Sequence, residues 1–337
     1  MAKRPTILSV ARQAGVSKST VSLVLQNSKK VKPSTRKAVE RAMVELNYVY
    51  NRSAANLRKA RTELVGLVIN DLCNPFFTEF AASAQMALAE AGYSTVIANT
   101  NENGELQAEV ISSMIEHGVA AFLISPAYDE DNRAFDLIER AGVPAIQVLR
   151  RADDRIDLFP HASPDYLMGS ALATRHLIEL GCSRIAFVGG LEEREVTERR
   201  TQSYRLALLE KQMKPRVFPG RPTRSFGREM AHLLHRDHPG IHAALCFNDL
   251  VAMGMLAGFA ELGVEVGRDF RLVGFDDIEE CSLAHPRLSS VHCGISEFGS
   301  NAAQAIVKWI TEERQPPGEH LTPVTLVARE SSLGLGG

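Results

Sequence analysis

Six apolar segments between residues 64 and 277 end in residues that can exchange hydrogen bonds with a ligand. If the segments are parallel strands, these residues converge at the carboxyl edges of the sheets, where open α/β proteins bind ligands. Guanidinium, carboxylate and amide groups at such an edge recognise hydroxyl groups through directed hydrogen bonds. The positions are Asn70–Asp71, Ser125, Arg150, Gly189–Arg194, Asn248–Asp249 and Asp276–Asp277. The pattern indicates a binding site rather than a nucleophile–base set.

A second polar set lies in the stretch GVSKSTVSLVLQNS, residues 15–28. On a helical wheel, Val21, Val24 and Leu25 share one face. The opposite face holds Lys18, Ser19, Ser22, Leu23 and Gln26. A leucine on this face is either one more exposed apolar side chain, which is common, or a contact made for a partner.

Residues 6–47 are expected to form three short helices that carry this face. Thr6 can cap the first helix, Gly15 turns the chain, and Ser17 can cap the second. Pro33 suits the first turn of a third helix. Two short helices joined by a tight turn predict a helix-turn-helix, whose second helix can enter a DNA major groove.

The net charge of the chain changes sign shortly after these helices, near residue 62. Residues 1–62 hold 14 basic and 2 acidic side chains, a net charge of +12, and the remainder holds 24 basic and 38 acidic side chains, a net charge of −14. This division predicts that only the N-terminal part meets a polyanion. Residues 48–62 are polar and basic, and we interpret them as a linker that becomes helical when something packs against it.

From Glu63 onward, strand-like and helix-like segments alternate. The expected strands include residues 64–70, 94–100, 119–126, 184–190, 243–248 and 270–277, and the expected helices include 77–93, 104–118, 164–180, 198–212 and 249–262. Such alternation predicts an α/β fold with parallel sheets covered on both faces. A break near residues 150–163 divides the pattern into two similar halves.

Other features narrow the class of protein. The five cysteines form no C-x-x-C pair and suggest reduced thiols in the cytoplasm. We expect no membrane span, secretory signal, cofactor or metal, although His232, His235 and His238 are spaced so that successive pairs could meet on a helix.

These motifs together resemble the lactose-repressor (LacI/GalR) family of bacterial transcription regulators. The resemblance spans the chain and rests on TILSVARQAGVSKSTVSLVLQN, VKPSTRKAVERAMVELNYVYN, LVGLVINDLCNPFF, FNDLVAMG, VGFDD and HPRLSSV, in that order. It implies a helix-turn-helix head (1–48), a hinge linker (49–62) and a two-lobed body like the type I periplasmic binding proteins (63–337). The implied N-lobe comprises about 63–161 and 293–323, and the C-lobe about 162–292 and 324–337.

The resemblance also assigns the DNA contacts of a homodimer on a palindromic operator. They are Thr6, Ser17, Lys18, Ser19, Ser22, Leu23, Gln26, Tyr48, Asn51, Ala54 and Leu57. Leu23 stands where many relatives have arginine, so it is expected to contact a thymine methyl or a base-pair edge. Leu57 matches the family's minor-groove wedge. The glycine-rich C-terminus lacks the heptad helix that makes one relative a tetramer.

A small effector is expected in the cleft between the lobes. By resemblance, it is lined by Asp71, Phe76, Phe77, Arg150, Arg194, Arg200, Asn248 and Asp276. Aromatic faces with arginine, asparagine and aspartate favour a mono- or disaccharide. Val196 and Arg221 depart from the family pattern and argue mildly against a purine.

Alternative functions stay open at this point. A regulator of the same family could respond to a nucleobase or another metabolite, and strand–helix alternation also suits sugar-active enzymes. The sequence has neither G-x-G-x-x-G after its first strand nor G-x-x-x-x-G-K-[ST]. A periplasmic sugar-binding protein would need a signal peptide and no basic head. A repressor in the cytoplasm is therefore the favoured interpretation.

Overall fold

The structure is a computed structural model that describes residues 5–25, 28, 30–46, 48, 62–128 and 132–334. It divides into two compact units, Met1–Thr62 and Glu63–Gly337. We call them the head and the body and describe each by itself.

The described residues of the head form three helices around one small core. They are α1 (Ile7–Gln13), α2 (Lys18–Leu25) and α3 (Pro33–Glu45). Val10 and Ala11 of α1, Val21 of α2, and Val39 and Ala42 of α3 are buried together. The three expected helices are therefore present, and the turn between α1 and α2 passes through Gly15 at φ 67°.

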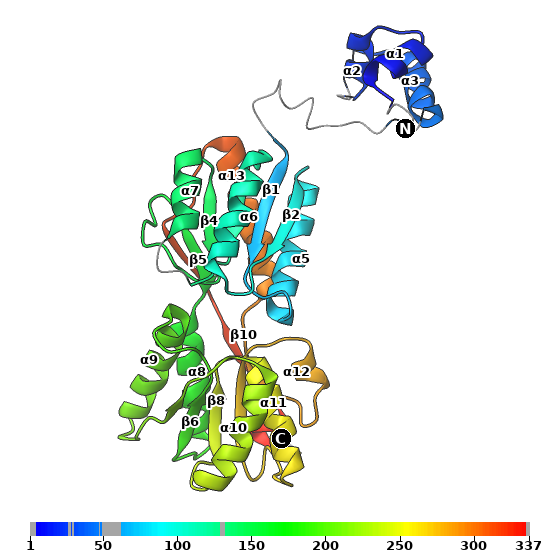
Figure 1. The fold of residues 1–337 in the computed structure, drawn as a ribbon. Coiled ribbons are helices and arrows are strands. Elements are labelled where there is room, and N and C mark those ends of the chain that lie inside the picture. The colour runs from blue at the N-terminus through cyan, green and yellow to red at the C-terminus, as the bar shows by residue number, and fades with distance from the viewer. Residues whose placement is uncertain are drawn as a thin grey trace. The chain divides into compact units, whose positions relative to one another are not determined.

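The body consists of two α/β lobes, each built on one six-stranded sheet (Figure 1). The N-lobe sheet has the order β11-β5-β4-β3-β1-β2, and its paired strands are parallel. Its strands are β1 (Leu64–Ile69), β2 (Ser94–Asn99), β3 (Ala121–Ile124), β4 (Ala145–Val148), β5 (His161–Pro164) and β11 (Glu319–Thr322). Its helices are α5 (Pro75–Glu90), α6 (Gly104–Glu116), α7 (Arg133–Ala141) and α13 (Ile295–Glu312).

The C-lobe sheet has the order β12-β10-β9-β8-β6-β7, in which only the β12–β10 pair is antiparallel. Its strands are β6 (Ile185–Val188), β7 (Val217–Phe218), β8 (Ala243–Cys246), β9 (Arg271–Asp276), β10 (Ser289–His292) and β12 (Thr325–Val327). Its helices are α8 (Tyr166–Glu179), α9 (Glu195–Leu209), α10 (Arg224–Asp237), α11 (Asp249–Glu261), α12 (Glu280–Leu283) and α14 (Glu330–Leu333).

Helices pack on the sheets, whose central strands are apolar on both sides. In the N-lobe, α5 packs against α13, and α6 packs against α7. In the C-lobe, α8 packs against α9, and α10 packs against α11. The four residues of β3, of β6 and of β8 are all buried, as parallel strands between two helix layers should be.

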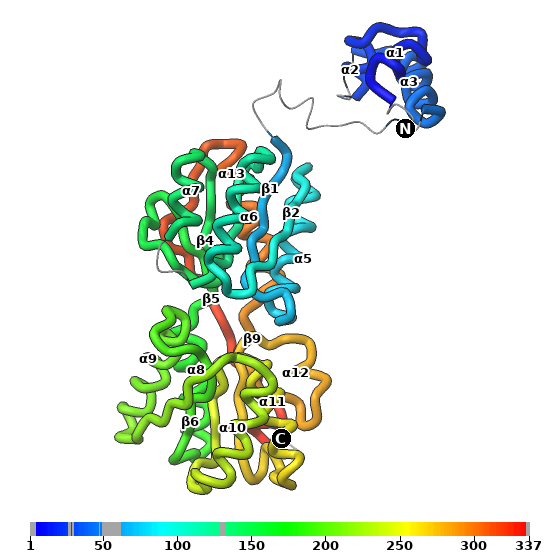
Figure 2. The backbone as a smooth tube through the Cα atoms, in the orientation of Figure 1, coloured from blue at the N-terminus to red at the C-terminus, as the bar shows by residue number. Residues whose placement is uncertain are grey.

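The chain passes between the lobes after β5, after β10 and after β11. The two later crossings are the orange and red segments between the lobes in Figure 2. The first crossing follows Pro164, so residues 162–164, expected in the C-lobe, belong to the N-lobe. Their strand pairs with β4 and with β11, and backbone pairing from a distant segment cannot be seen in local sequence. Helix α9 likewise starts at Glu195 and not near 198.

Candidate functional site

Helix α2 gives the head a polar surface with one leucine in it. Lys18 and Ser19 are exposed, Leu23 is 37% exposed, and Val21 and Val24 are buried in the head core. This matches the helical wheel. The exposed leucine is a chemically distinct point on an otherwise hydrogen-bonding surface.

The other predicted DNA-contact residues lie in several environments. The Thr6 hydroxyl accepts a hydrogen bond from the Ser9 N–H at 3.3 Å, and the Ser17 hydroxyl accepts one from the Thr20 N–H at 3.1 Å. Both expected caps are confirmed. Ser22 is half-buried, and Tyr48 packs against the head core. Gln26, Asn51, Ala54 and Leu57 lie outside the described residues.

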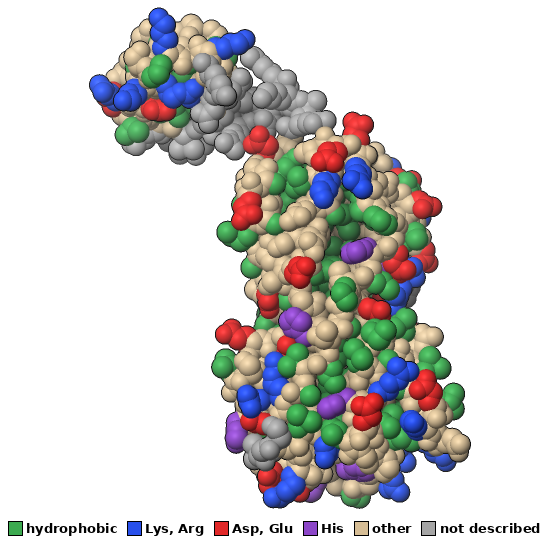
Figure 3. Space-filling model, turned by 180° about the vertical axis from the view of Figure 1, so that it is seen from behind, with side chains coloured by type: hydrophobic (Ala, Val, Ile, Leu, Met, Phe, Trp, Pro, Cys, Tyr) green, Lys and Arg blue, Asp and Glu red, His purple; other side chains and the backbone are tan. Residues whose placement is uncertain are grey.

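Lysine and arginine side chains project from the described surface of the head (Figure 3). The exposed basic residues include Arg12, Lys18, Lys30, Lys32 and Lys37. A small domain that carries this charge attracts phosphate groups. The head therefore combines a phosphate-binding surface with a helix that can enter a groove.

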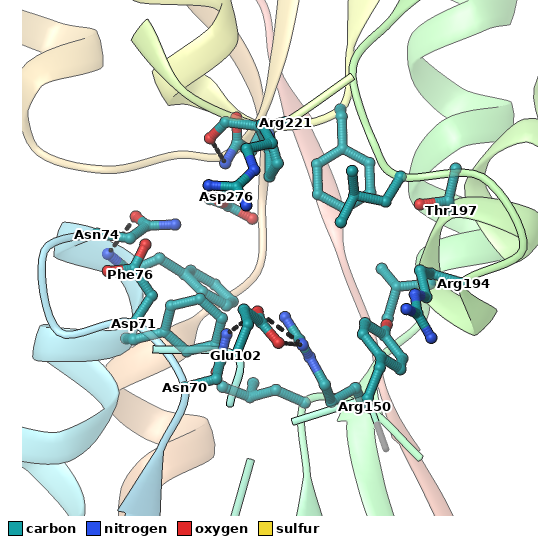
Figure 4. Close-up of a pocket in the computed structure, with 18 of the residues that line it drawn as sticks. Asn70, Asp71, Asn74, Phe76, Glu102, Arg150, Arg194, Thr197, Arg221 and Asp276 are labelled. Atoms are coloured by element: carbon teal, nitrogen blue, oxygen red, sulfur yellow. Dashed lines mark hydrogen bonds and ion pairs between the residues drawn. The ribbon is translucent and has the colours of Figure 1, made fainter. Parts of the chain in front are cut away.

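The body has a cavity of about 300 Å³ between its two lobes. All eight residues predicted for the effector cleft line it: Asp71, Phe76, Phe77, Arg150, Arg194, Arg200, Asn248 and Asp276. They come from both lobes and surround one space (Figure 4). The carboxyl ends of β1, β4, β8 and β9 meet there, as expected for ligand sites of open parallel sheets.

A buried ion pair lies at the inner wall of the cavity. Arg200 and Asp276 are 3% and 5% exposed, and their closest side-chain N and O atoms are 3.6 Å apart. Arg200 also donates a hydrogen bond to the carbonyl of Phe247, and its guanidinium carbon lies 3.7 Å from the ring centroid of Phe275. Its Nε has no hydrogen-bond partner among the described residues. The pair is long and incompletely bonded, which leaves capacity for a ligand.

Burial raises the pKa of two carboxyl groups at this wall. Burial raises the pKa of Asp276 well above its usual range, and the adjacent Arg200 opposes this shift. Behind it, burial raises the pKa of Asp249 to about 6, although Ser290 and the Ile278 N–H donate hydrogen bonds to its carboxylate. A ligand donor that replaces water here would favour the charged form of Asp276.

A chain of hydrogen bonds crosses the N-lobe side of the cavity. The Ser125 hydroxyl donates to Asn70 Oδ1 at 2.7 Å, and Asn70 Nδ2 donates to Glu102 Oε1 at 2.7 Å. Arg150 Nη1 then donates to both carboxylate oxygens of Glu102, at 2.9 and 2.8 Å (Figure 4). This chain fixes Arg150 in the cavity wall and neutralises its charge.

Aromatic rings form the apolar part of the wall. Phe76 and Phe77 meet edge to face, with centroids 5.5 Å apart. Phe247, Tyr166 and Tyr128 also line the cavity. Such rings cover the apolar faces of a cyclic ligand while the polar groups bind its rim.

Residues 6–51 match the model for bacterial regulatory proteins of the lacI family, and residues 174–332 match a periplasmic binding protein-like domain. The HTH-type transcriptional regulator GalR of Escherichia coli (strain K12) is 32% identical over 97% of this chain and 95% of its own length. The chain belongs to the LacI family. It is thus a DNA-binding transcription regulator by family, and its relatives are named as regulators and not as enzymes.

Solved structures of LacI-family proteins have the same fold. The lac repressor dimer bound to operator and the anti-inducer ONPF matches with a TM-score of 0.86 and 26% identity, over 98% of this chain and 100% of that one. The complex of the transcriptional regulator CelR with cellobiose matches with a TM-score of 0.73 and 30% identity, over 98% and 100%. Within the residues described for this LacI-family chain, no helix is long and apolar enough to cross a membrane.

Sequence reasoning missed several wall residues of this LacI-family body, among them four with polar or aromatic side chains: Glu102, Tyr128, Tyr166 and Phe247. Three of them follow a strand, namely β2, β3 and β8, so the strand-end rule could have found them. Tyr166 is the first residue of α8, and its hydroxyl donates to the carbonyl of Leu149 in the other lobe at 2.5 Å. Nothing in the local sequence marks that contact.

Proposed function

We propose that this LacI-family regulator binds a palindromic operator as a homodimer in the cytoplasm and represses transcription there. A mono- or disaccharide bound in the interlobe cavity controls it. The head (1–48) reads the operator, a hinge linker (49–62) inserts Leu57 into the minor groove, and the body (63–337) binds the effector and the second subunit.

The chemistry of the cavity carries the sugar assignment. Carboxylate, guanidinium and amide groups from both lobes face one space of about 300 Å³, beside the rings of Phe76 and Phe77. This combination suits a ring with several hydroxyl groups and an apolar face. The matching structure of CelR with cellobiose shows a related body with a disaccharide.

The dimer assignment is supported by apolar side chains that the monomer leaves exposed. Val96 and Ile97 on the edge strand β2 are 39% and 41% exposed, and Met86 on α5 is 61% exposed. In the C-lobe, Leu283 on α12 is 74% exposed. Exposed apolar edges favour association. The matching lac repressor structure is itself a dimer bound to operator.

The test is a selection of DNA by the full chain. Purified protein is incubated with random duplexes at about 150 mM salt, and bound duplexes are amplified over several rounds. The affinity of the protein for the most enriched duplex is then compared with its affinity for a scrambled duplex. We expect an enriched palindrome, bound by two chains per duplex and much more tightly than the scrambled sequence. Equal affinity for both duplexes, or one chain per duplex, contradicts the proposal.

A further inference from the structure

The charges of the cavity wall do not balance. Arg150 is paired with Glu102, and Arg200 is paired with Asp276. Arg194 and Arg221 also line the cavity, and within the described parts of the chain neither has a carboxylate oxygen within 4.0 Å. The remaining acid of the wall is Asp71, in the N-lobe, whose Oδ1 accepts a hydrogen bond from the Cys73 N–H at 2.9 Å. The C-lobe wall therefore carries excess positive charge.

Arg194 holds its guanidinium at the point where the lobes meet. Its guanidinium carbon lies 4.9 Å from the centroid of the Tyr128 ring, and that of Arg150 lies 4.6 Å from the same centroid. Arg150 and Tyr128 belong to the N-lobe and Arg194 to the C-lobe, so two like charges from opposite lobes share one ring. Glu102 compensates only Arg150.

Helix ends add to this positive potential. The N-cap residues of α5, α9, α10 and α11 all line the cavity. Asn74, Thr223 and Asn248 each satisfy a backbone N–H of their own helix, whereas Arg194, the N-cap of α9, makes no such bond. The N-terminal end of a helix carries partial positive charge and favours an anion. At α9 this end coincides with the Arg194 guanidinium. The first turn also holds Glu195, which is paired with Arg199, and Glu198, and neither forms an ion pair with Arg194.

We propose that the effector is an anionic carbohydrate, whose carboxylate or phosphate group binds to Arg194 at the start of α9. The inference rests on the proposed function, because it names the class of sugar that the same cavity takes. The anionic group lies against the C-lobe wall, and the sugar hydroxyls face Asp71, Asn70 and the Arg200–Asp276 pair.

The free-energy cost of desolvating the Arg194 guanidinium supports this orientation. When the lobes close on a neutral sugar, the Arg194 guanidinium loses water and gains no opposite charge, which is unfavourable. A carboxylate or phosphate supplies two parallel charge-assisted hydrogen bonds to a guanidinium. The same group would be repelled by Asp71, which lies in the other lobe.

The test compares matched sugars on the full chain by melting temperature and by calorimetry. The probes are D-glucose, D-glucuronate and D-glucose 6-phosphate, together with D-galactose, D-galacturonate and D-galactose 6-phosphate. We expect at least one anionic member to raise the melting temperature and to bind at least about tenfold more tightly than its neutral counterpart. Its affinity should fall as salt rises.

Variants assign the effect to Arg194. Arg194→Gln should weaken binding of the anionic sugar roughly tenfold to hundredfold, since one charged hydrogen-bonding partner is lost. Arg194→Lys should keep part of the preference for the anionic over the neutral sugar. Retained binding by this variant would also show that the site still folds. Arg205→Gln is the matched control, because Arg205 lies on the same helix, is exposed and does not line the cavity.

The inference is overturned if the neutral members bind as tightly as the anionic ones, or if Arg194→Gln binds the anion like the parent. In that case a neutral sugar that changes operator affinity still supports the proposed function. If no member binds or changes operator affinity, the anionic effector is wrong, and titration of operator affinity with neutral disaccharides then decides the sugar assignment of the proposed function separately.

Discussion

At the scale of single residues, Asp276 combines an unusual backbone conformation with a buried ionisable side chain. Its backbone has φ 116°, and Asp277 follows at φ 59°. Residues other than glycine rarely adopt positive φ values. This conformation ends β9 and places the Asp276 carboxyl next to Arg200. Strain of this kind persists where the surroundings fix it, and here it accompanies the wall of the proposed effector site.

Asp249 should make the stability of the body depend on pH. Its pKa is raised to about 6 in the folded protein, from an ordinary value of 3.8, chiefly by burial. Between these values the folded state holds a proton that the unfolded chain has lost, so the free energy of unfolding falls as pH rises through this window. It should fall by roughly 2–3 kcal/mol more in the parent than in Asp249→Asn.

Urea denaturation of both proteins from pH 4 to 7, followed by circular dichroism, measures this difference. Parallel stability curves for the parent and the variant would show that Asp249 is not the titrating group.

Leu23 should contribute sequence specificity and little general affinity. It is exposed on α2 and offers only apolar contact. Leu23→Ala should weaken binding to the selected operator about fivefold to tenfold, as expected for one altered base-pair contact, and leave binding to scrambled DNA unchanged. Leu8→Ala is the control, because Leu8 is a 56% exposed leucine on α1. Equal losses for Leu8→Ala and Leu23→Ala in fluorescence anisotropy would rule out a specific role.

At the scale of elements, α10 and α11 pack so closely that glycine is required between them. A Cβ atom at Gly254 would lie 2.0 Å from the carbonyl oxygen of Arg224, and one at Gly227 would lie 2.0 Å from that of Val251. Both clashes involve backbone, which cannot move aside as a flexible side chain can. These helices carry Thr223 and Asn248 at their starts, so their packing sets part of the cavity wall.

Gly254→Ala should therefore destabilise the body by at least about 2 kcal/mol, as overpacking does. Helix propensity alone predicts the opposite sign, a gain of about 1 kcal/mol. The control is Ser225→Ala at an exposed position of α10, which should change the free energy of unfolding by less than about 0.5 kcal/mol. A variant Gly254→Ala as stable as the parent in urea would contradict the packing argument.

Local sequence predicted the helices and strands better than it predicted which distant segments they pair with. Apolar runs such as residues 64–70 and 243–248 indicated strands because both faces are buried. The short strand β5 was missed because it depends on pairing with β11, more than a hundred residues later. Cleft residues at strand ends, such as Asp71 and Asp276, were predictable because the strands themselves could be located. Tyr166 was not predictable, because its role depends on a contact with Leu149 in the other lobe.

At the scale of the whole molecule, we expect the basic head and the acidic body to have separate partners. The head carries +12 and the rest of the chain −14, so the proposed DNA binding and effector binding should be separable by charge and by unit. Coupling between them requires that the effector favour one arrangement of the lobes. Such a coupling is typically about 1–3 kcal/mol, a change in operator affinity of roughly 5–150-fold.

The most direct measurement titrates the selected operator with the full chain, with and without the sugar that most raises its melting temperature, and repeats this with Asp276→Ala. The parent should change operator affinity at least about fivefold on adding the sugar. Asp276→Ala should not respond at the parental sugar concentration. If the sugar is an inducer, the variant keeps the affinity of the sugar-free parent, and if it is a corepressor, the variant binds weakly with or without it. An Asp276→Ala protein that responds like the parent would contradict the assignment of the interlobe cavity as the effector site.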